Sequence, residues 1–261
     1  MRFISLSSGS SGNSYFLGDD TLSLLIDAGI GIRTIKKGLS NYDISTEEIE
    51  FILITHDHSD HIKHVKSLSR RLQKPVISTG AILKAIDSAP PHKNEKSWFW
   101  REIEKEVGYT IKGVDIIAFE VPHDGVDNLG FFIDFRGEKF TFITDLGEVT
   151  EKVLYYASRS NHLILESNYD CKMLEESSYP SVLKERIRGR KGHLSNSEAA
   201  AAIKKIYHPG VKNIFLCHLS ENCNTPTLAF TAAAEALKEV EGGEKINLFP
   251  LPRRGHQSFN I

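Results

Sequence analysis

The sequence predicts an α/β protein in which β-sheets are covered by helices. Short, nearly continuous apolar runs bounded by turn residues are typical of buried strands, and segments with helical periodicity lie between them in both halves of the chain. No internal repeat, linker or compositional break divides the 261 residues. This length fits one large domain or two small ones packed together, and because no such break is present we expect a single domain spanning residues 1–261.

The apolar runs and the helical periodicity give the positions of the expected strands and helices. Strands are expected at 22–26, 51–54, 116–119, 163–165 and 214–216, and a hairpin at 130–135 and 139–143. Helices are expected at 32–39, 62–72, 195–207 and 226–240. Ser195 and Glu198 have the spacing of a capping box, and Thr225 precedes Pro226 as a helix start. The least regular segment, 87–107 with Trp98-Phe99-Trp100, is interpreted as a surface flap packed on the core.

Composition limits the possible classes of function. Hydrophobic residues at 40% and charged residues at 25% are typical of a folded globular protein. No apolar run approaches 18 residues, the N-terminus lacks a signal-peptide pattern, and three cysteines are too few for a disulfide framework. We therefore expect a cytoplasmic protein without a membrane span. The net charge of −2 means that any site for a polyanion has to be local.

A histidine cluster is the strongest functional signal. His56, His58, Asp60 and His61 follow the strand at 51–54, at a strand-to-helix corner. Imidazoles at positions i and i+2 of an extended segment can converge on one cation, and a carboxylate with a third imidazole at the helix start can serve a second. The cluster therefore predicts a metal site.

Three more potential ligands each follow an apolar strand. His123 comes after 116–122, Asp145 after 140–144 and His218 after 214–217. Taken singly, each is typical of a polar residue at a strand end. Their repeated placement after strands favours a shared functional site.

Together with Asp27 in Leu25-Ile26-Asp27-Ala28-Gly29, these residues resemble the five motifs of the metallo-β-lactamase superfamily. The resemblance implies a four-layer αββα sandwich with a dinuclear metal site along one edge. It implies that one metal is bound by His56, His58 and His123, the other by Asp60, His61 and His218, with Asp145 bridging them. Asp27 would fix the histidine loop by hydrogen bonds.

The ligand types narrow the choice of metal. Flavodiiron relatives replace the second histidine of the cluster with Glu, whereas His58 is intact, so redox iron chemistry is disfavoured. Cys217 precedes His218 and should point to the opposite face of its strand, as a small buried hydrophobe. Because histidine and carboxylate ligands suit zinc, manganese or iron, we expect two divalent ions, zinc or manganese before iron.

Glu166 and His193 favour phosphodiester chemistry. Glu166 ends the strand at 163–165, and His193 lies just before the helix at 195–207. In the RNase Z-like branch a Glu and a His in such places act with the metal-bound Asp, which implies catalytic roles for Asp60, Glu166 and His193. Glu166 can orient His193, and a cationic imidazole can protonate the leaving alkoxide or stabilise a phosphorane oxygen. Without the metal motif, we would interpret Glu166 as an ordinary carboxylate at a strand end and His193 as an ordinary histidine at a helix start.

Five segments, at 7–13, 166–170, 179–180, 192–196 and 218–220, resemble the WalJ/YycJ/VicX family over essentially the whole chain. The resemblance implies a metal-dependent 5′-to-3′ exonuclease that acts on DNA and is linked to DNA repair. The sequence itself leaves DNA and RNA open as substrates, and the resemblance favours DNA. One departure is His64, which replaces a residue that is usually Gly in the superfamily. It is either an exposed residue of the first helical turn or a residue that crowds the rim of the metal site, and we favour the exposed position.

Two regions are candidate phosphate contacts. Arg188 and Arg190 belong to a basic run that leads into His193, and a second basic run at 63–74 follows the histidine cluster. Such runs are usually solvated surface, but their closeness in sequence to site elements favours a phosphate-tracking groove. Ser10, Ser11 and Asn13 lie in a Ser/Gly loop that can offer backbone N–H groups to a phosphate.

Two other functions stay open. Glyoxalase-II-like enzymes use a very similar metal set, so a thioester, lactone or small phosphodiester is a second class of substrate. Glu166 with His193 argues against it. A metal-stabilised regulatory protein without catalysis is the third possibility, although it would not require a complete ligand set with acid–base residues. The sequence gives no prediction of protein partners or oligomeric state.

Overall fold

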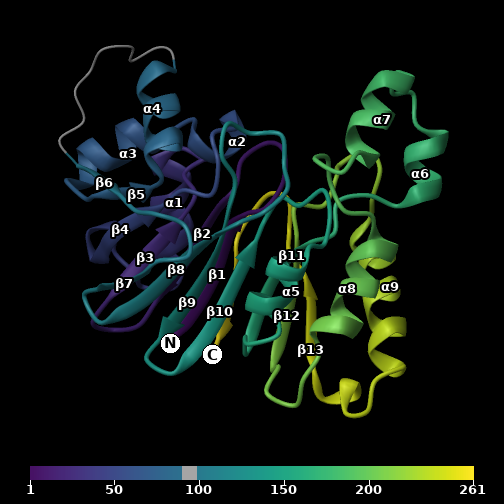
Figure 1. Cartoon of the computed structure of the whole chain (residues 1–261). Coiled ribbons are helices and arrows are strands. Elements are labelled where there is room, and N and C mark those ends of the chain that lie inside the picture. Colours follow the sequence, from purple (N-terminus) through teal and green to yellow (C-terminus); the bar gives the residue numbers. More distant parts are fainter. Residues whose placement is uncertain (90–98) are drawn as a thin grey trace. The chain divides into compact units, whose positions relative to one another are not determined.

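The computed structural model describes residues 1–89 and 99–261 (Figure 1). Two compact units are present. The first comprises Met1–Glu104, Gly125–Asp127 and Pro252–Ile261, and the second comprises Lys105–Asp124 and Asn128–Leu251. Each unit contains one seven-stranded sheet and its own helices. The expectation of one domain across residues 1–261 stays a prediction.

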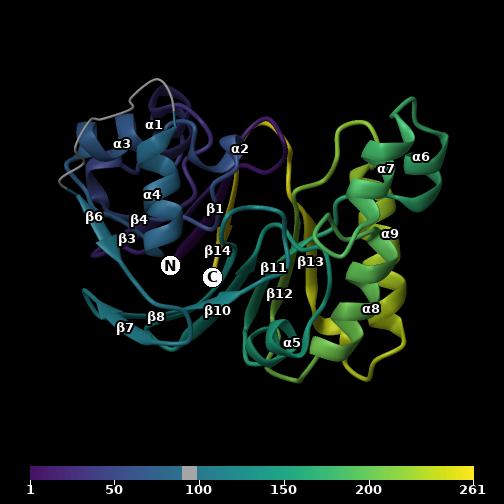
Figure 2. The same ribbon diagram turned by 45° about the horizontal axis from the view of Figure 1, so that its top comes forward.

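The sheet of the first unit has the order β14-β1-β2-β3-β4-β5-β6. Its strands are β1 (Arg2–Ser7), β2 (Ser14–Gly18), β3 (Ser23–Ile26), β4 (Ile49–Leu53), β5 (Val76–Ser78), β6 (Trp100–Glu102) and β14 (Gln257–Asn260). The pairs from β14 to β3 are antiparallel, and those from β3 to β6 are parallel. The helices are α1 (Ile32–Ser40), η1 (Thr46–Glu48), α2 (Ser59–Ile62), α3 (Val65–Leu72) and α4 (Gly80–Ser88). Figures 1 and 2 show α1, α3 and α4 grouped beside this sheet.

The sheet of the second unit has the order β13-β12-β11-β10-β9-β8-β7. Its strands are β7 (Gly108–Ile111), β8 (Val114–Glu120), β9 (Leu129–Phe135), β10 (Glu138–Ile143), β11 (His162–Glu166), β12 (Asn213–Cys217) and β13 (Asn247–Pro250). The pairs from β7 to β10 are antiparallel, and those from β10 to β13 are parallel. The helices are α5 (Glu151–Ala157), α6 (Cys171–Glu176), α7 (Ser181–Arg188), α8 (Asn196–Ile206), α9 (Pro226–Lys238) and η2 (Gly243–Lys245). In both views α8 and α9 lie side by side.

The apolar runs of the sequence become the buried strands of these sheets. Ile143, Leu165 and Leu216, from three neighbouring parallel strands, are fully buried in the core of the second unit. The helix signals also hold, since the Ser195 hydroxyl accepts the Glu198 N–H, and the Glu198 carboxylate accepts the Ser195 N–H at 2.8 Å. Within the described part of the chain, no helix combines the length and apolarity that a membrane span requires.

The expectations for the helix at 62–72 and for His64 are wrong. The helix is broken into α2 and α3, because His64 leaves the helical conformation at φ −114° and ψ 2° and begins α3 as its N-terminal capping residue. His64 is half-buried rather than exposed, and its N–H donates to the Ala28 carbonyl at 3.0 Å. Within the segment at 87–107, Trp100–Glu102 form the edge strand β6, and the interpretation of this segment as a surface flap stays a prediction. Trp98 lies outside the described residues.

Candidate functional site

The histidine loop, residues 55–61, lies at the carboxyl end of β4 in the first unit. Its backbone leaves the strand and enters α2, with His58 as the capping residue in an extended conformation at φ −64° and ψ 145°. The His56 ring centroid lies 4.6 Å from that of His58 and 4.0 Å from that of His61. Asp60 Oδ2 is 3.6 Å from His61 Nε2. The loop therefore gathers three imidazoles and a carboxylate in a small volume.

Asp27, directly after β3, holds this loop in place. Its buried carboxylate accepts the Thr55 N–H at 2.9 Å, the Thr55 hydroxyl at 3.0 Å and the Nδ1–H of His61 at 2.8 Å. Because a carboxylate can only accept, the proton of His61 lies on Nδ1 and Nε2 carries the lone pair. A carboxylate that orients an imidazole in this way is typical of metal sites.

The backbone of Asp27 is strained, which offers a test of its role. Its φ of 63° lies in the left-handed region that glycine tolerates best. We expect Asp27→Ala to lower the free energy of unfolding by about 3 kcal/mol, because it removes buried hydrogen bonds. Asp27→Gly loses the same bonds but should cost about 1 kcal/mol less, since it relieves the backbone. Urea unfolding of the metal-free protein measures both values, and equal losses in the two variants would exclude a strained backbone at this position.

Asn13, expected to contact substrate, is completely buried beside the histidine loop. Its Nδ2 donates to Asp60 Oδ2 at 3.2 Å and to His61 Nε2 at 2.9 Å, and its Oδ1 accepts the Gly9 N–H at 2.8 Å. Both ends of the amide are thus used within the protein, and a contact of Asn13 with substrate stays a prediction. Asn13 supports two side chains of the histidine loop.

Ser10 and Ser11 are exposed at the tip of the same turn. Two of the backbone N–H groups beside them are already bonded, that of Gly12 to the Gly9 carbonyl at 2.8 Å and that of Asn13 to the Asp60 carbonyl at 2.7 Å. The turn therefore presents serine side chains rather than these two N–H groups. A contact between the serines and substrate stays a prediction.

In the second unit, polar side chains gather at the carboxyl ends of neighbouring strands. Asp145 follows β10, Glu166 ends β11 and His218 follows β12. These strands are parallel and in register, with Ile143 opposite Leu165 and Glu166 opposite Cys217. The Asp145 Oδ1 lies 3.2 Å from His218 Nδ1 and 3.8 Å from His123 Nε2. Strand register therefore brings together side chains that are far apart in the sequence.

Glu166 is the buried centre of this group. Its Oε1 accepts from His193 Nδ1 at 2.7 Å and lies 3.0 Å from His218 Nδ1. Its Oε2 accepts the N–H groups of Leu146 at 2.8 Å and Leu194 at 3.1 Å. Burial alone would raise the pKa of Glu166, but the charge of His193 and the hydrogen bonds from His193 and His218 lower it below the ordinary value. The carboxylate is therefore ionised at neutral pH.

His123 and His193, two further histidines near Asp145, respond differently to their surroundings. Burial lowers the pKa of His123, whose Nδ1 donates to the Gly192 carbonyl at 2.8 Å, and this favours the neutral form that a metal requires. Burial also acts to lower the pKa of His193, but the charge of Glu166 and the bond to it outweigh burial and raise the pKa above the ordinary value. His193 is therefore suited to carry a proton.

The basic residues before His193 are paired with acids. Arg190 Nε lies 2.6 Å from Glu148, Arg188 forms an ion pair with Glu175, and Arg186 lies 2.6 Å from Asp124. Exposed pairs of this kind add little stability, but they offset the positive charge of the run. Contact of Arg188 and Arg190 with substrate stays a prediction.

Two residues were not singled out for the site by sequence reasoning. The Thr55 hydroxyl lies 3.0 Å from His56 Nδ1 as well as bonding to Asp27. Asn168 donates from Nδ2 to the His218 carbonyl at 2.8 Å. The only signal in the sequence for Thr55 or Asn168 is a short polar side chain close to a predicted site residue. Such side chains are too common for this signal to identify site residues.

The donor sets of both units fit a divalent cation. In the second unit Asp145, Glu166, His193 and His218 each offer a ligand atom, and these atoms lie within 4.8 Å of one another. The first unit offers the imidazoles of the histidine loop with Asp60. Imidazole and carboxylate groups held by buried hydrogen bonds are the donors that zinc, manganese and iron sites use. The chain therefore carries candidate binding sites for divalent metal.

The comparisons with known proteins identify the family of the chain. The family model described as a beta-lactamase superfamily domain matches residues 23–219, which include the histidine loop and the three strand ends. The chain belongs to the β-lactamase superfamily. Within it, the chain is 31% identical over 242 residues to Exodeoxyribonuclease WalJ of Streptococcus pneumoniae (strain D39), covering 93% of this chain and 90% of the relative. It is 29% identical over 254 residues to Exodeoxyribonuclease YycJ of Bacillus anthracis, covering 92% and 90%.

Solved structures of the superfamily show the same fold. The metallo-β-lactamase fold protein YhfI from Bacillus subtilis matches with a TM-score of 0.72 at 14% identity, covering 99% of each chain. The short form of human tRNase Z matches with a TM-score of 0.67 at 16% identity, covering 100% of this chain and 99% of the other. The predicted metallo-β-lactamase fold, the WalJ/YycJ branch and the prediction of a hydrolase are confirmed.

Proposed function

We propose that this protein is a metal-dependent phosphodiesterase that degrades DNA as a 5′-to-3′ exonuclease in the cytoplasm. The observation that carries the proposal is the 2.7 Å bond between Glu166 and His193, beside Asp145 and His218. A buried carboxylate that holds a protonated imidazole is suited to general acid catalysis at an alkoxide leaving group. The names of the curated relatives, both exodeoxyribonucleases, support DNA over RNA as the substrate.

We propose the following ligands for two metal ions. His56, His58 and His123 would hold one ion, Asp60, His61 and His218 the other, and Asp145 both. Nδ1 of His61 is bonded to Asp27 and Nδ1 of His123 to Gly192, so Nε2 is the nitrogen that each would offer to a metal. In His61 this nitrogen would exchange its bond with the Asn13 amide for the metal. No cysteine belongs to the set, and we propose zinc or manganese before iron.

Two divalent ions, when bound, lower the pKa of a water molecule and offset the charge of the scissile phosphate. The protein's own side chains would orient the water and protonate the leaving oxygen. Asp60, held by the Asn13 amide through Oδ2, would orient the attacking water. His193, held through Nδ1 by Glu166, would donate its proton from Nε2 to the leaving oxygen.

The role of His193 is tested by its replacement with alanine. We expect His193→Ala to lower kcat by about 10²- to 10⁴-fold, the range for loss of a general acid, and to leave the metal content unchanged. Single-turnover kinetics and metal analysis of the same preparation give the two values. If the variant loses metal, His193 is a ligand, and the assignment of His218 would have to be revised.

The proposed function is tested by a time course on 5′-phosphorylated linear duplex DNA labelled at one end, with Mn²⁺ or Zn²⁺ added. Progressive release of mononucleotides from the 5′ end is the expected result, and His58→Ala, assayed in parallel, should release none. This control detects a contaminating nuclease. A protein that binds metal but leaves DNA intact would contradict the proposal, and thioesters, lactones and small phosphodiesters would be assayed next.

A further inference from the structure

A basic pocket lies on the first unit, away from the side chains of the histidine loop. It is a hollow of about 570 Å³ formed by α1, η1 and the end of α3. Arg33 and Lys36 line it from α1, and Arg71 and Lys74 line it from the end of α3. Glu47 is the one carboxylate among its lining residues. Four cations therefore face one hollow across two helices that are not neighbours in sequence.

Three of these cations have no acidic partner among the residues that the structure describes. Arg33, Lys36 and Arg71 are exposed, and none forms an ion pair within residues 1–89 and 99–261. Only Lys74 is paired, with its Nζ 3.3 Å from Glu50. Since an unpaired surface cation gives up no ion pair when it meets a phosphate, this pocket is better suited to a polyanion than the paired arginines of α7.

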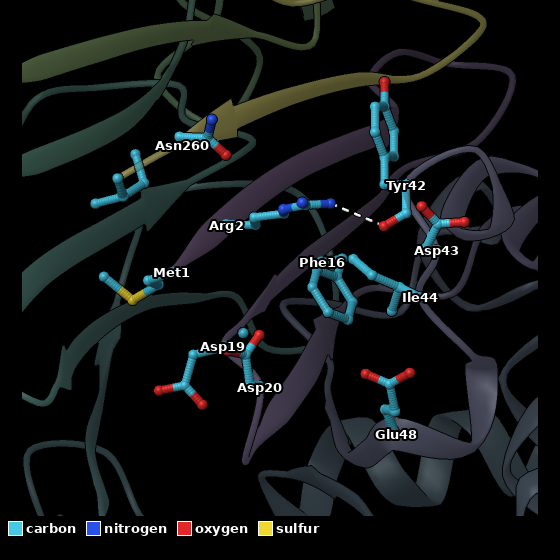
Figure 3. A pocket seen from close by; sticks show the side chains of 12 residues that line it. Met1, Arg2, Phe16, Asp19, Asp20, Tyr42, Asp43, Ile44, Glu48 and Asn260 are labelled. Atoms are coloured by element: carbon cyan, nitrogen blue, oxygen red, sulfur yellow. Dashed lines mark hydrogen bonds between the residues drawn. The ribbon is translucent and has the colours of Figure 1, made fainter.

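A second pocket of the same unit has the opposite charge. It encloses about 420 Å³ and is lined by Asp19, Asp20, Asp43 and Glu48. Figure 3 shows these carboxylates around the hollow, and the Arg2 guanidinium donating to the Tyr42 carbonyl at 2.8 Å. A polyanion is repelled from this acidic pocket and attracted to the basic one. The first unit thus carries an acidic and a basic pocket, a separation of charge that the net charge of −2 for the whole chain does not reveal.

The basic pocket is also connected to the histidine loop through the backbone. Ala28 donates its N–H to the His61 carbonyl at 2.8 Å and accepts the His64 N–H at 3.0 Å. The chain then enters α1 at Ile32, the first lining residue of the pocket. The loop that supports the predicted ligands therefore leads directly into the helix that carries Arg33 and Lys36.

We propose that the basic pocket binds backbone phosphates of the DNA substrate at a distance from the catalytic site. The inference rests on the proposed nuclease function and adds to it a place where the strand is held. Arg33, Lys36 and Arg71 form the contacts, and the pocket reads no base sequence because charge attraction to phosphates carries no sequence information.

The test compares two triple variants that remove the same charge, each in a His58→Ala background that prevents cleavage. One carries Arg33→Gln, Lys36→Gln and Arg71→Gln. The other, the control variant, carries Lys172→Gln, Lys204→Gln and Lys212→Gln, three exposed lysines that are paired with acids and belong to no predicted site. Binding of a fluorescent duplex is measured between about 50 and 200 mM salt. The magnitude of the slope of log K against log salt should fall by about 2 to 3 in the pocket variant, since each lost phosphate contact removes about 0.9. The control variant should keep the parental slope.

Two further outcomes separate this inference from the proposed function. If both triple variants have the same slope while the unmodified chain degrades DNA, the pocket is not a phosphate site and the nuclease function stands. If the unmodified chain hydrolyses bis(p-nitrophenyl) phosphate but neither binds nor degrades DNA, both proposals are overturned. The pocket triple variant with His58 intact should hydrolyse this small diester at the rate of the unmodified chain, which shows that the catalytic site is undamaged.

Discussion

Replacement of Asp145 by alanine is expected to abolish hydrolysis. The side chain is 4% exposed, and its Oδ1 lies 3.2 Å from His218 Nδ1 and 3.8 Å from His123 Nε2. As the proposed ligand of both ions, it cannot be replaced by a neutral methyl group without loss of metal. We expect DNA degradation at the background rate and a clear drop in metal content by mass spectrometry.

Two conservative substitutions, at Asp145 and at the preceding residue, serve as controls for this prediction. Asp145→Asn keeps the size and one oxygen ligand, so it should retain more metal than Asp145→Ala but remain strongly impaired. Thr144→Ser, one residue earlier, changes a buried hydroxyl side chain without touching the ligand set and should stay active. Full activity in a metal-stripped double variant with His58→Ala and Asp145→Ala would exclude the proposed mechanism.

Loss of the Glu166 carboxylate is expected to have the second largest effect. Glu166→Ala leaves the N–H groups of Leu146 and Leu194 without their acceptor and removes the partner of a charged imidazole. Breaking one partner of a buried charged pair costs about 3–5 kcal/mol. We expect a loss of this size in urea unfolding, together with a fall in kcat at least as large as that of His193→Ala.

Glu166→Gln separates the charge from the hydrogen bonds, because its amide oxygen can still accept from the backbone. We expect a smaller loss of stability than in Glu166→Ala but a similar loss of kcat, since an amide does not hold the proton on His193. A Glu166→Gln variant with normal turnover would show that Glu166 supports the backbone only.

The same pair predicts how stability depends on pH in the metal-free protein. The contribution of Glu166 is present above its ordinary pKa of 4.5 and is lost as the pH falls through the lower pKa of the folded state. The contribution of His193 is present below its ordinary pKa of 6.5 and is lost as the pH rises through the higher folded value. Stability should therefore be greatest between these limits, and Glu166→Gln should flatten the profile on both sides.

Much of the site is predictable because it follows from strand order. His123, Asp145, Glu166 and His218 all lie at strand ends that the apolar runs mark, and strand register then brings the latter three together. The histidine loop is predictable because its donors are adjacent in sequence. The break in the helix at His64 is not predictable, because it depends on a backbone hydrogen bond to Ala28, which is distant in the chain.

Side-chain roles at the surface depended on partners that the sequence does not reveal. A Ser/Gly loop suggested a substrate contact for Asn13, but the fold buries that residue against Asp60 and His61. A basic run pointed to Arg188 and Arg190, whose charges are offset by acids 13 and 42 residues away. The strands β1, β2 and β14 were missed because polar residues interrupt or flank their short apolar runs.

The pairing of β14 with β1 has a consequence for how the chain acquires its structure. Arg2 pairs with Asn260, and the Ile261 N–H donates to the Met1 carbonyl at 3.0 Å, so β1 gains this second neighbour beside β2 only after the residues between β1 and β14 have been synthesised. Pairing over such a sequence separation is slow, and an unpaired strand edge is open to other chains in the meantime. The growing polypeptide therefore carries an exposed β1 edge until β14 closes the sheet, and that edge invites aggregation during translation.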